Sequence, residues 1–235
     1  MKFTVRALSQ AADLKGTIQM DLTKFKGIIF DLDGTLVDSS HVWSDIDQKF
    51  MKRRGIRIPD DYFKKVSCMN YSQAARYTIE RFGLSETAED IIEEWYSMAE
   101  NEYANNVLIK PGADTFLRYI KSNGTKIALA TASSEPLYSS ALKNNGIYDL
   151  FDFFATTEQV RRGKGFPDVY ELASSGISLK PEECAVFEDI VEGVRGAKAG
   201  NFTAVACLDK HYAADWEEMK LIADFYFSDY RTLIR

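Results

Sequence analysis

The chain has 235 residues, of which 46% are hydrophobic and 27% charged, and its formal net charge is -6. This length fits one or two domains, and the composition excludes disordered, collagen-like and disulfide-framework proteins. The negative balance argues against binding of a nucleic-acid backbone, because such proteins carry a basic face. An anionic substrate would therefore need locally placed cations or a metal ion.

Cysteine usage and hydropathy indicate the compartment. The three cysteines are widely spaced and odd in number, which is typical of neither a disulfide framework nor a zinc site, so we expect a reducing cytoplasm. No run approaches the roughly 18 apolar residues of a spanning helix, and the N-terminus lacks the apolar core of a signal peptide. Residues 1–23 are interpreted as a lead-in, for which two alternatives are open: a short strand in "FTVRAL" or partial disorder.

Six short runs are continuously apolar, which is typical of strands buried on both faces. They are "GIIFDLD" from Gly27, "KIALATA" from Lys126, "FDFFATT" from Phe151, "CAVFED" from Cys184, "FTAVAC" from Phe202 and "DFYFSD" from Asp224. Helix-like segments lie between them, and two of these end at Gly124 and Gly146, which suit left-handed C-terminal caps. Strands that alternate with single helices predict a doubly wound parallel sheet of the α/β class.

The segment from His41 to Asn106 shows helical spacing without strands. Three apolar stripes recur there: Val42, Ile46 and Phe50; Ala75, Ile79 and Phe82; Ile92, Tyr96, Ala99 and Tyr103. We interpret these stripes as packing inside a helical bundle rather than as a binding surface. The predicted organisation is an α/β core over 24–40 and 107–235, interrupted by a helical domain over 41–106.

Polar side chains gather where the predicted strands end, which is the edge where parallel sheets bind ligands. Asp31 and Asp33 follow the first strand, Thr131 and Ser133 the second, and Glu188 and Asp189 the fourth. Because like charges repel, such a cluster costs stability unless a cation or ligand holds it. Oxygen ligands without His or Cys favour Mg²⁺, and a phosphoryl group is then the natural substrate. One carboxylate could attack phosphorus, another move a proton, and the others hold the metal.

The spacing of the first two acids follows from strand geometry. Residues i and i+2 share a face, so Asp31 and Asp33 can face one site while Leu32 packs inward. Gly34 permits a sharp turn and a close approach of backbone N–H groups to phosphate. We expect Asp38 and Ser39 to form a turn or helix N-cap and the hinge into the helical domain.

A cation beside the phosphate is also needed. Lys164 lies between glycines and before Pro167, in a loop that precedes a predicted helix. A solvated basic loop is the alternative interpretation, and we favour a phosphate-binding role for Lys164.

These residues resemble the haloacid dehalogenase-like superfamily, and within it the β-phosphoglucomutase-like group with an inserted helical cap. Four signatures appear in order from about Lys24 onward. They are "DLDGTLVDS" from Asp31, "ALATASS" through Thr131, "KGFPD" from Lys164 and "FEDIVEGVRGAKAG" around Glu188. The resemblance implies a Rossmann-like core and a magnesium-dependent phosphatase with an aspartyl-phosphate intermediate, whose cap closes over the site.

The resemblance also implies roles for single residues. Asp31 would be the nucleophile and a metal ligand, and Asp33 the general acid and base, with its backbone carbonyl on the metal. The phosphoryl group would be bound by Thr131, Ala132, Lys164 and Gly34. Asp189 would hold Mg²⁺, with Glu188 as a further ligand or its support.

Two positions depart from the family pattern. A hydroxyl residue commonly follows the acidic pair, where this chain has Ile190, and a proline usually follows the lysine, where it has Gly165. Ile190 removes a side chain that could bond backbone N–H groups, and Gly165 makes the loop more flexible. We expect Gly193 to keep the turn. Neither departure removes a reacting group.

Phosphatase and mutase differ in the cap. The resembling sugar phosphomutases carry a histidine in the first cap helix, where this chain has Trp43, and a cap arginine that "VSCMNYSQ" lacks. Hydrolysis of a small phosphorylated metabolite, such as a sugar phosphate, is therefore favoured over a phosphohexomutase. A non-catalytic phosphometabolite-binding protein is the alternative of another class. Trp43, Met69 and Asn70 are candidate substrate contacts, and we expect a monomer without nucleic-acid or membrane partners.

Overall fold

The computed structural model describes residues 20–39, 41–59, 61–66 and 71–234. The chain divides into two compact units. One contains the residues up to Val37, Ile109–Ser134 and the residues from Ile147 onward, and the other contains Asp38–Leu108 and Glu135–Gly146. We call them the α/β unit and the helical unit. The predicted strand in "FTVRAL" lies outside the described residues.

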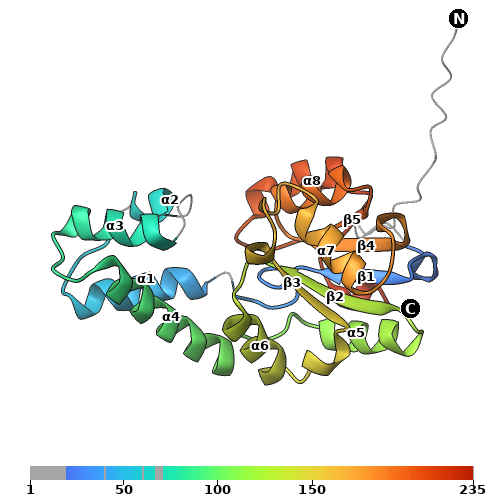
Figure 1. Ribbon diagram of the computed structural model, residues 1–235, viewed down its shortest axis with the longest axis horizontal. Coiled ribbons are helices and arrows are strands. Elements are labelled where there is room, and N and C mark those ends of the chain that lie inside the picture. The colour runs from blue at the N-terminus through green and yellow to red at the C-terminus, as the bar shows by residue number, and fades with distance from the viewer. Residues whose placement is uncertain (1–19, 40, 60, 67–70, 235) are drawn as a thin grey trace, which may run out of the picture. The chain divides into compact units, whose positions relative to one another are not determined.

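In the part of the chain that the structure describes, the α/β unit is built on one six-stranded parallel sheet in the order β3-β2-β1-β4-β5-β6 (Figure 1). The strands are β1 (Gly27–Phe30), β2 (Lys126–Thr131), β3 (Phe153–Thr156), β4 (Cys184–Glu188), β5 (Thr203–Cys207) and β6 (Phe225–Phe227). Each of the six apolar runs forms a strand, so the doubly wound α/β class is confirmed. The strand that carries the first acidic pair lies at the centre of the sheet, between β2 and β4.

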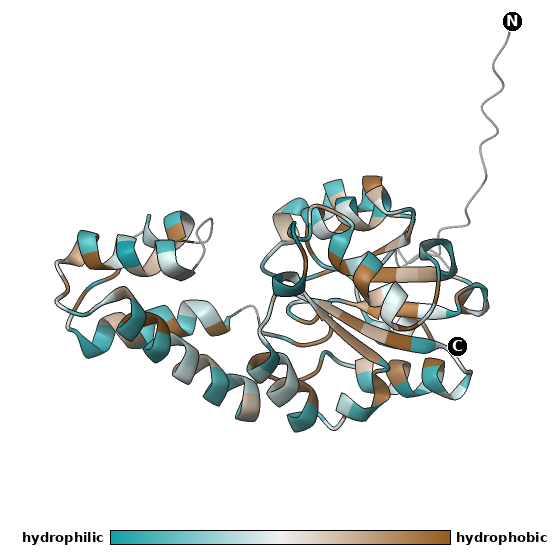
Figure 2. Cartoon of the chain, viewed as in Figure 1, coloured by the Kyte–Doolittle hydropathy of each residue, from teal (hydrophilic) through white to brown (hydrophobic). Residues whose placement is uncertain are grey.

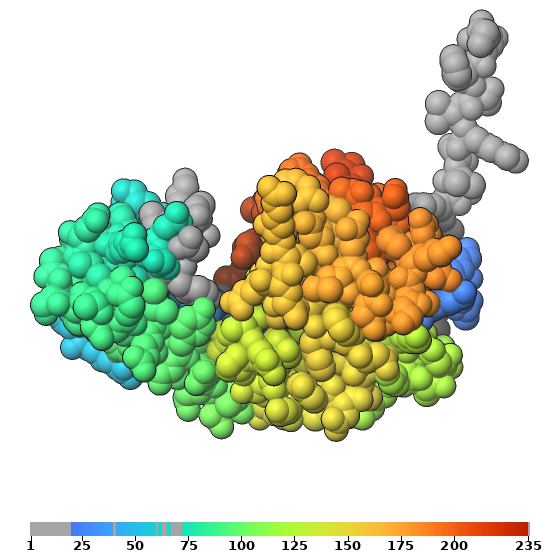
Figure 3. All heavy atoms as spheres, in the orientation of Figure 1, coloured from blue at the N-terminus to red at the C-terminus, as the bar shows by residue number. Residues whose placement is uncertain are grey.

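The helices of the α/β unit cover both faces of this sheet. They are α5 (Ala113–Ser122), α7 (Asp168–Gly176), α8 (Val191–Ala199) and α9 (Trp216–Ile222). On one face Ile29, Val186 and Ala204 pack with Val169 of α7 and Val194 of α8 in a buried cluster. The strands are mostly apolar in Figure 2, and atoms around α7 hide them in Figure 3. Burial on both faces explains why the runs are continuous rather than alternating.

The opposite face of the sheet is aromatic. Phe30 of β1 contacts Phe187 of β4 at 4.9 Å between ring centroids and Phe116 of α5 at 6.2 Å. Tyr230 continues this layer, since its ring lies 4.7 Å from that of Phe227. Edge-to-face and tilted rings of this kind stabilise a core by about 0.5–1.5 kcal/mol per pair beyond the buried area.

The described residues of the helical unit form five helices. They are α1 (Val42–Arg53), α2 (Tyr62–Val66), α3 (Tyr71–Phe82), α4 (Ala88–Asn105) and α6 (Glu135–Asn144). The inclusion of α6 differs from the predicted boundaries, which assigned 135–146 to the core. The side-chain amide of Asn145 donates to the Val107 carbonyl at 2.9 Å, so the end of α6 is tied to the end of α4. The alternation of strands and helices along the chain places α6 between β2 and β3, and it does not show that α6 packs with α4.

The apolar stripes are correct in α1 and partly wrong in α4. Val42, Ile46 and Phe50 are buried as expected. In α4 the buried row begins with Ile91 and Trp95 rather than Ile92 and Tyr96, which are half-buried, and it continues through Ala99 and Tyr103. The Trp95 ring packs 5.5 Å from that of Phe50, and this contact between α4 and α1 is what buries Trp95.

The left-handed caps at Gly124 and Gly146 are confirmed, with φ of +82° and +64°. The predicted N-cap role of Asp38 or Ser39 is wrong. Helix α1 has His41 as its N-cap, without a side-chain cap bond. The other predicted alternative, a turn, is present at Ser39, whose carbonyl accepts from the Val42 N–H at 2.9 Å. Asp38 begins the helical unit, which agrees with its predicted place at the junction.

A half-buried acid in α1 predicts a pH-dependent stability. Burial raises the pKa of Asp47 to about 7. Because the unfolded chain loses this proton near pH 4, the folded state loses stability as the pH rises from about 4 to about 7. Asp47→Asn should therefore raise the melting temperature at about pH 8 and change it little at about pH 4. Thermal unfolding at the two pH values checks this, with Asp45→Asn of the same helix as control. An equal change at both pH values would contradict it.

Candidate active site

The sheet register brings the acidic strand ends together. Phe30 of β1 is paired with Leu129 of β2 and Phe187 of β4, so the residues that follow these strands meet at one edge. The Asp31 N–H donates to the Phe187 carbonyl at 3.0 Å, which holds the first acid beside the end of β4. Parallel pairing thus joins parts of the chain that are distant in sequence.

Asp31, Glu188 and Asp189 form an acidic cluster in the buried interior of this edge. Their ligand atoms lie within 4.8 Å of one another, and each residue is at most 2% exposed. Among the described residues, Glu188 Oε2 and Asp189 Oδ2 have no hydrogen-bond partner. Buried carboxylate oxygens without donors are costly, and an all-oxygen set fits a hard divalent cation. The residues present therefore fit a magnesium site.

Lys164 brings a cation to this cluster. Its ammonium contacts Asp31 Oδ1 and lies 2.8 Å from Glu188 Oε1. Burial alone would lower the lysine pKa, but the charges of Asp31 and Glu188 outweigh it and raise the pKa above its usual range. Sequence reasoning missed Tyr170 of α7, whose hydroxyl donates to the same Glu188 oxygen at 2.8 Å. No local motif distinguishes this tyrosine from an ordinary core residue.

The acidic cluster is electrostatically unfavourable by itself. Burial raises the pKa of Asp31 to about 7, and the charges of Glu188 and Asp33 add to this, while Lys164 opposes it. The pKa of Asp189 is raised well above its ordinary value by burial and by the charges of Asp31 and Glu188. A cation between these carboxylates would relieve the repulsion.

The end of β2 holds Asp33. The Ser133 hydroxyl donates to Asp33 Oδ2 at 2.5 Å, and the Ser133 N–H donates to Thr131 Oγ1 at 3.0 Å. Thr131 is fully buried, whereas Ala132 is exposed. Because the Thr131 oxygen accepts from backbone, its hydroxyl hydrogen can be donated to a ligand oxygen. The bond between Ser133 and Asp33 was not predicted, although Ser133 was expected at this edge.

Gly34 forms the predicted sharp turn, but its own N–H is not directed to a ligand. Its N–H already donates to the Val37 carbonyl at 3.0 Å, so we do not retain it as a phosphate donor. Its φ is +79°, and a Cβ there would lie 2.0 Å from Asp189 Oδ2. Glycine is therefore required for the left-handed turn and for the close approach of Asp189.

Two glycines of α8 make room for the charged residues. Gly193 lies inside the helix, so its expected role in a turn is wrong; a Cβ there would lie 2.4 Å from Glu188 Cδ. At Gly196, one turn later, a Cβ would lie 1.9 Å from the backbone oxygen of Lys164. Sequence reasoning missed Gly196, although the G-x-x-G spacing on one helix face was its signal.

Gly196→Ala should destabilise the protein, contrary to helix propensity. Alanine favours a helix by about 1 kcal/mol over glycine, but the clash with the Lys164 backbone should cost about 3 kcal/mol and displace the lysine. Urea unfolding and kcat/KM measure the two effects. Gly165→Ala is the control, since a Cβ there meets nothing within 4 Å. A more stable Gly196→Ala variant with full activity would contradict the prediction.

Ile190 leaves the start of α8 without a side-chain cap. It is the N-cap residue of α8, with φ of -117° and ψ of 148°, and makes no side-chain cap bond. This agrees with the interpretation that isoleucine removes a local hydrogen bond. The acids before it remain in place, so the departure affects the helix start rather than the reacting groups.

Of the candidate substrate residues, one belongs to the helical unit and the other two lie outside the residues that the structure describes. Trp43 is a half-buried residue of α1, and Met69 and Asn70 lie outside the described residues.

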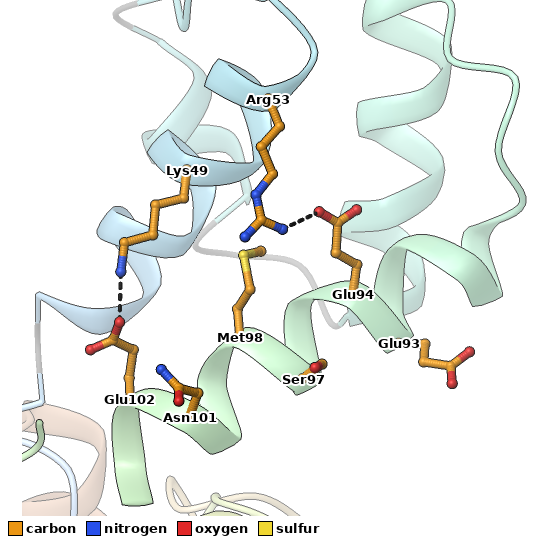
Figure 4. A pocket seen from close by; sticks show the side chains of 8 residues that line it. All are labelled: Lys49, Arg53, Glu93, Glu94, Ser97, Met98, Asn101 and Glu102. Carbon is orange, nitrogen blue, oxygen red and sulfur yellow. Dashed lines mark hydrogen bonds and ion pairs between the residues drawn. The ribbon is translucent and has the colours of Figure 1, made fainter. Parts of the chain in front are cut away.

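A groove of about 460 Å³ lies between α1 and α4 (Figure 4). Its Lys49 and Arg53 are bound to Glu102 at 2.6 Å and Glu94 at 2.9 Å, so these cations are already neutralised.

Comparison with known proteins gives the family of this chain. The family model of haloacid dehalogenase-like hydrolases matches residues 25–201. Hexitol phosphatase A of Escherichia coli is 30% identical over 187 residues, which cover 77% of this chain and 82% of that protein. The bifunctional riboflavin kinase/FMN phosphatase of Arabidopsis thaliana is 27% identical over 76% of this chain, which spans only 47% of that relative.

The fold is shared with solved structures. The crystal structure of β-phosphoglucomutase from Clostridium difficile has a TM-score of 0.69 and 23% identity, with 89% of this chain and 93% of that chain covered. The chain belongs to the haloacid dehalogenase-like hydrolases. It is an enzyme of the phosphoric monoester hydrolase type. None of the helices in the described part of the chain combines the length and the hydropathy that a membrane-spanning segment requires.

Proposed function

We propose that this protein is a magnesium-dependent phosphatase that hydrolyses a small phosphorylated metabolite through an aspartyl-phosphate on Asp31. The observation that carries the proposal is the buried acidic cluster with Lys164 bound to two of its members. Phosphoryl transfer depends on positioning and charge neutralisation, and this arrangement supplies both.

Asp31, Asp189 and Glu188 would hold Mg²⁺, together with the backbone carbonyl of Asp33. When bound, the ion would neutralise charge on the phosphoryl oxygens. Unpartnered oxygens on Glu188 and Asp189 support this assignment. The ammonium of Lys164 would share the neutralisation, and the Thr131 hydroxyl would donate to a phosphoryl oxygen, with Ala132 beside it.

The first chemical step is an attack on phosphorus by an Asp31 carboxylate oxygen, which forms the acyl phosphate as the bond to the leaving oxygen breaks. The carboxyl group of Asp33 gives its proton to that oxygen, so the product leaves as an alcohol. In the second step Asp33, now a carboxylate, takes a proton from water as the water oxygen attacks phosphorus. Phosphate leaves and Asp31 is restored. The hydrogen bond from Ser133 would orient Asp33 for both transfers.

A phosphorylated sugar or polyol is the proposed substrate class, because hexitol phosphatase A is a relative over most of the chain. Trp43, Met69 and Asn70 of the segment 41–106, the proposed cap, are the candidate substrate contacts. We propose hydrolysis rather than mutase chemistry, because the named relatives are phosphatases and the phosphoglucomutase likeness shows the fold alone. We further propose a cytoplasmic monomer.

A substrate screen tests the class. Phosphate release should be measured with Mg²⁺ over phosphorylated hexitols, hexoses, nucleotides and small acids, and a hexose 1-phosphate should be followed for isomerisation. We expect the highest kcat/KM with a sugar or polyol phosphate. We expect no phosphate release after chelation of the metal by EDTA. Preference for nucleotides would overturn the substrate class, and isomerisation without net phosphate release would overturn hydrolysis.

A further inference from the structure

Lys110 contacts the turn at Gly34 but does not belong to the acidic cluster. It stands between Ile109, which bridges to Val37, and the start of α5, and its own N–H donates to the Leu36 carbonyl at 2.8 Å. Its ammonium contacts the Gly34 carbonyl, the Leu208 carbonyl at 3.3 Å and Asp209 Oδ2 at 2.9 Å. An ammonium has three N–H donors, and these three acceptors use all of them.

Asp209 is the buried partner of this lysine. Its side chain is 4% exposed and that of Lys110 is 14% exposed. The second carboxylate oxygen of Asp209 accepts from the His211 N–H at 2.8 Å, which fixes the carboxylate just beyond β5. A buried pair of this kind contributes little net stability compared with an apolar pair, so its presence needs another explanation.

The contact with Gly34 connects the pair to the active site. We define Gly34 and Thr35 as the catalytic turn. The backbone carbonyls of this turn accept from two side chains: Lys110 binds the Gly34 carbonyl, and the Tyr230 hydroxyl donates to the Thr35 carbonyl at 3.2 Å. The turn also contacts the acidic cluster, because the Thr35 hydroxyl donates to Asp189 Oδ1 at 3.2 Å and Gly34 has no room for a Cβ beside Asp189 Oδ2. The turn is therefore held between Lys110 and Asp189.

We propose that Lys110, anchored by Asp209, is a positioning residue that holds the catalytic turn against Asp189 and keeps this carboxylate in the acidic cluster. Lys110 has no donor left for substrate, so it acts through the turn. The inference rests on the proposed magnesium site. Loss of a group that orients a metal ligand typically weakens metal affinity by about 10–100-fold.

Calorimetric titration with Mg²⁺ and thermal unfolding without Mg²⁺ test the proposal. The set comprises wild type, Lys110→Met, the double variant Lys110→Met/Asp209→Asn, and Lys121→Met, whose lysine binds Asp152 at 2.7 Å at the surface. In Lys110→Met we expect Mg²⁺ affinity to fall about 10–100-fold and the melting temperature to fall, because Asp209 is left buried without its partner. In the double variant the melting temperature should largely recover while Mg²⁺ affinity stays low.

The outcomes separate positioning from stability. Recovery of Mg²⁺ affinity together with the melting temperature in the double variant would overturn the proposal, as would unchanged affinity in Lys110→Met. Equal losses of affinity in Lys121→Met and Lys110→Met would also overturn it. A wild type that hydrolyses phosphate esters but binds no Mg²⁺ would instead overturn the magnesium site, and the inference with it. Phosphatase activity measured beside the titrations distinguishes that failure.

Discussion

Replacement of Asp31 with Asn is expected to lower Mg²⁺-dependent phosphate release by about four orders of magnitude or more, the loss typical of removing a nucleophile. The amide keeps the shape of the side chain but cannot form the acyl phosphate. It also removes one charge from the acidic cluster, where burial raises the Asp31 pKa to about 7, so the fold should persist. Initial rates with the best substrate of the screen and a melting curve measure the two effects.

The covalent intermediate gives a second measurement. Wild-type protein quenched in acid during turnover should carry a phosphoryl group on Asp31, and the Asp31→Asn variant should carry none. Asp149→Asn, at an exposed site of the same unit, is the matched control and should keep full activity. Substantial phosphate release by a folded Asp31→Asn variant would contradict the role of Asp31 as the nucleophile.

Replacement of Lys164 with Met is expected to lower kcat/KM by about 10²–10³-fold, the typical effect of removing one group that stabilises charge in a transition state. Because Lys164 opposes the elevation of the Asp31 pKa, this pKa should rise above about 7 in the variant. A nucleophile must be ionised, so the acidic limb of the pH–rate profile should move to higher pH. The loss of activity should therefore be larger at about pH 6 than at about pH 8.

The same variant should be less stable without metal. Breaking a buried ion pair by removal of one partner costs about 3–5 kcal/mol, and both Asp31 and Glu188 lose their cation here. Added Mg²⁺ should recover part of this stability. Lys198→Met is the control, because that lysine pairs with Asp224 at the surface. If Lys164→Met kept the wild-type pH profile, Lys164 would not act on the ionisation of Asp31.

Much of the fold could be predicted because its signals are local. A strand buried on both faces needs a continuous apolar run, so the run in "GIIF" marks β1 without knowledge of its partners. The same locality explains the error in α4, where both Trp95 and Tyr96 satisfy helical spacing and only the ring of Phe50 decides which is buried. It also explains why the boundaries predicted from sequence placed α6 in the core. The position of α6 between two strands is typical of a crossover helix, and only its packing puts it in the helical unit.

The sequence by itself determined the chemical groups of the site: Asp31, Asp33, Lys164 and the acids after β4 stand in recognisable motifs, since strand ends and glycine turns are encoded locally. Only the tertiary structure decided how these groups are held. Lys164 and Asp31 are separated by 133 residues, and Lys110 and Gly34 by 76. The physical reason is that hydrogen bonds and ion pairs depend on distance in space. Sheet register and helix packing set that distance, and spacing along the chain does not.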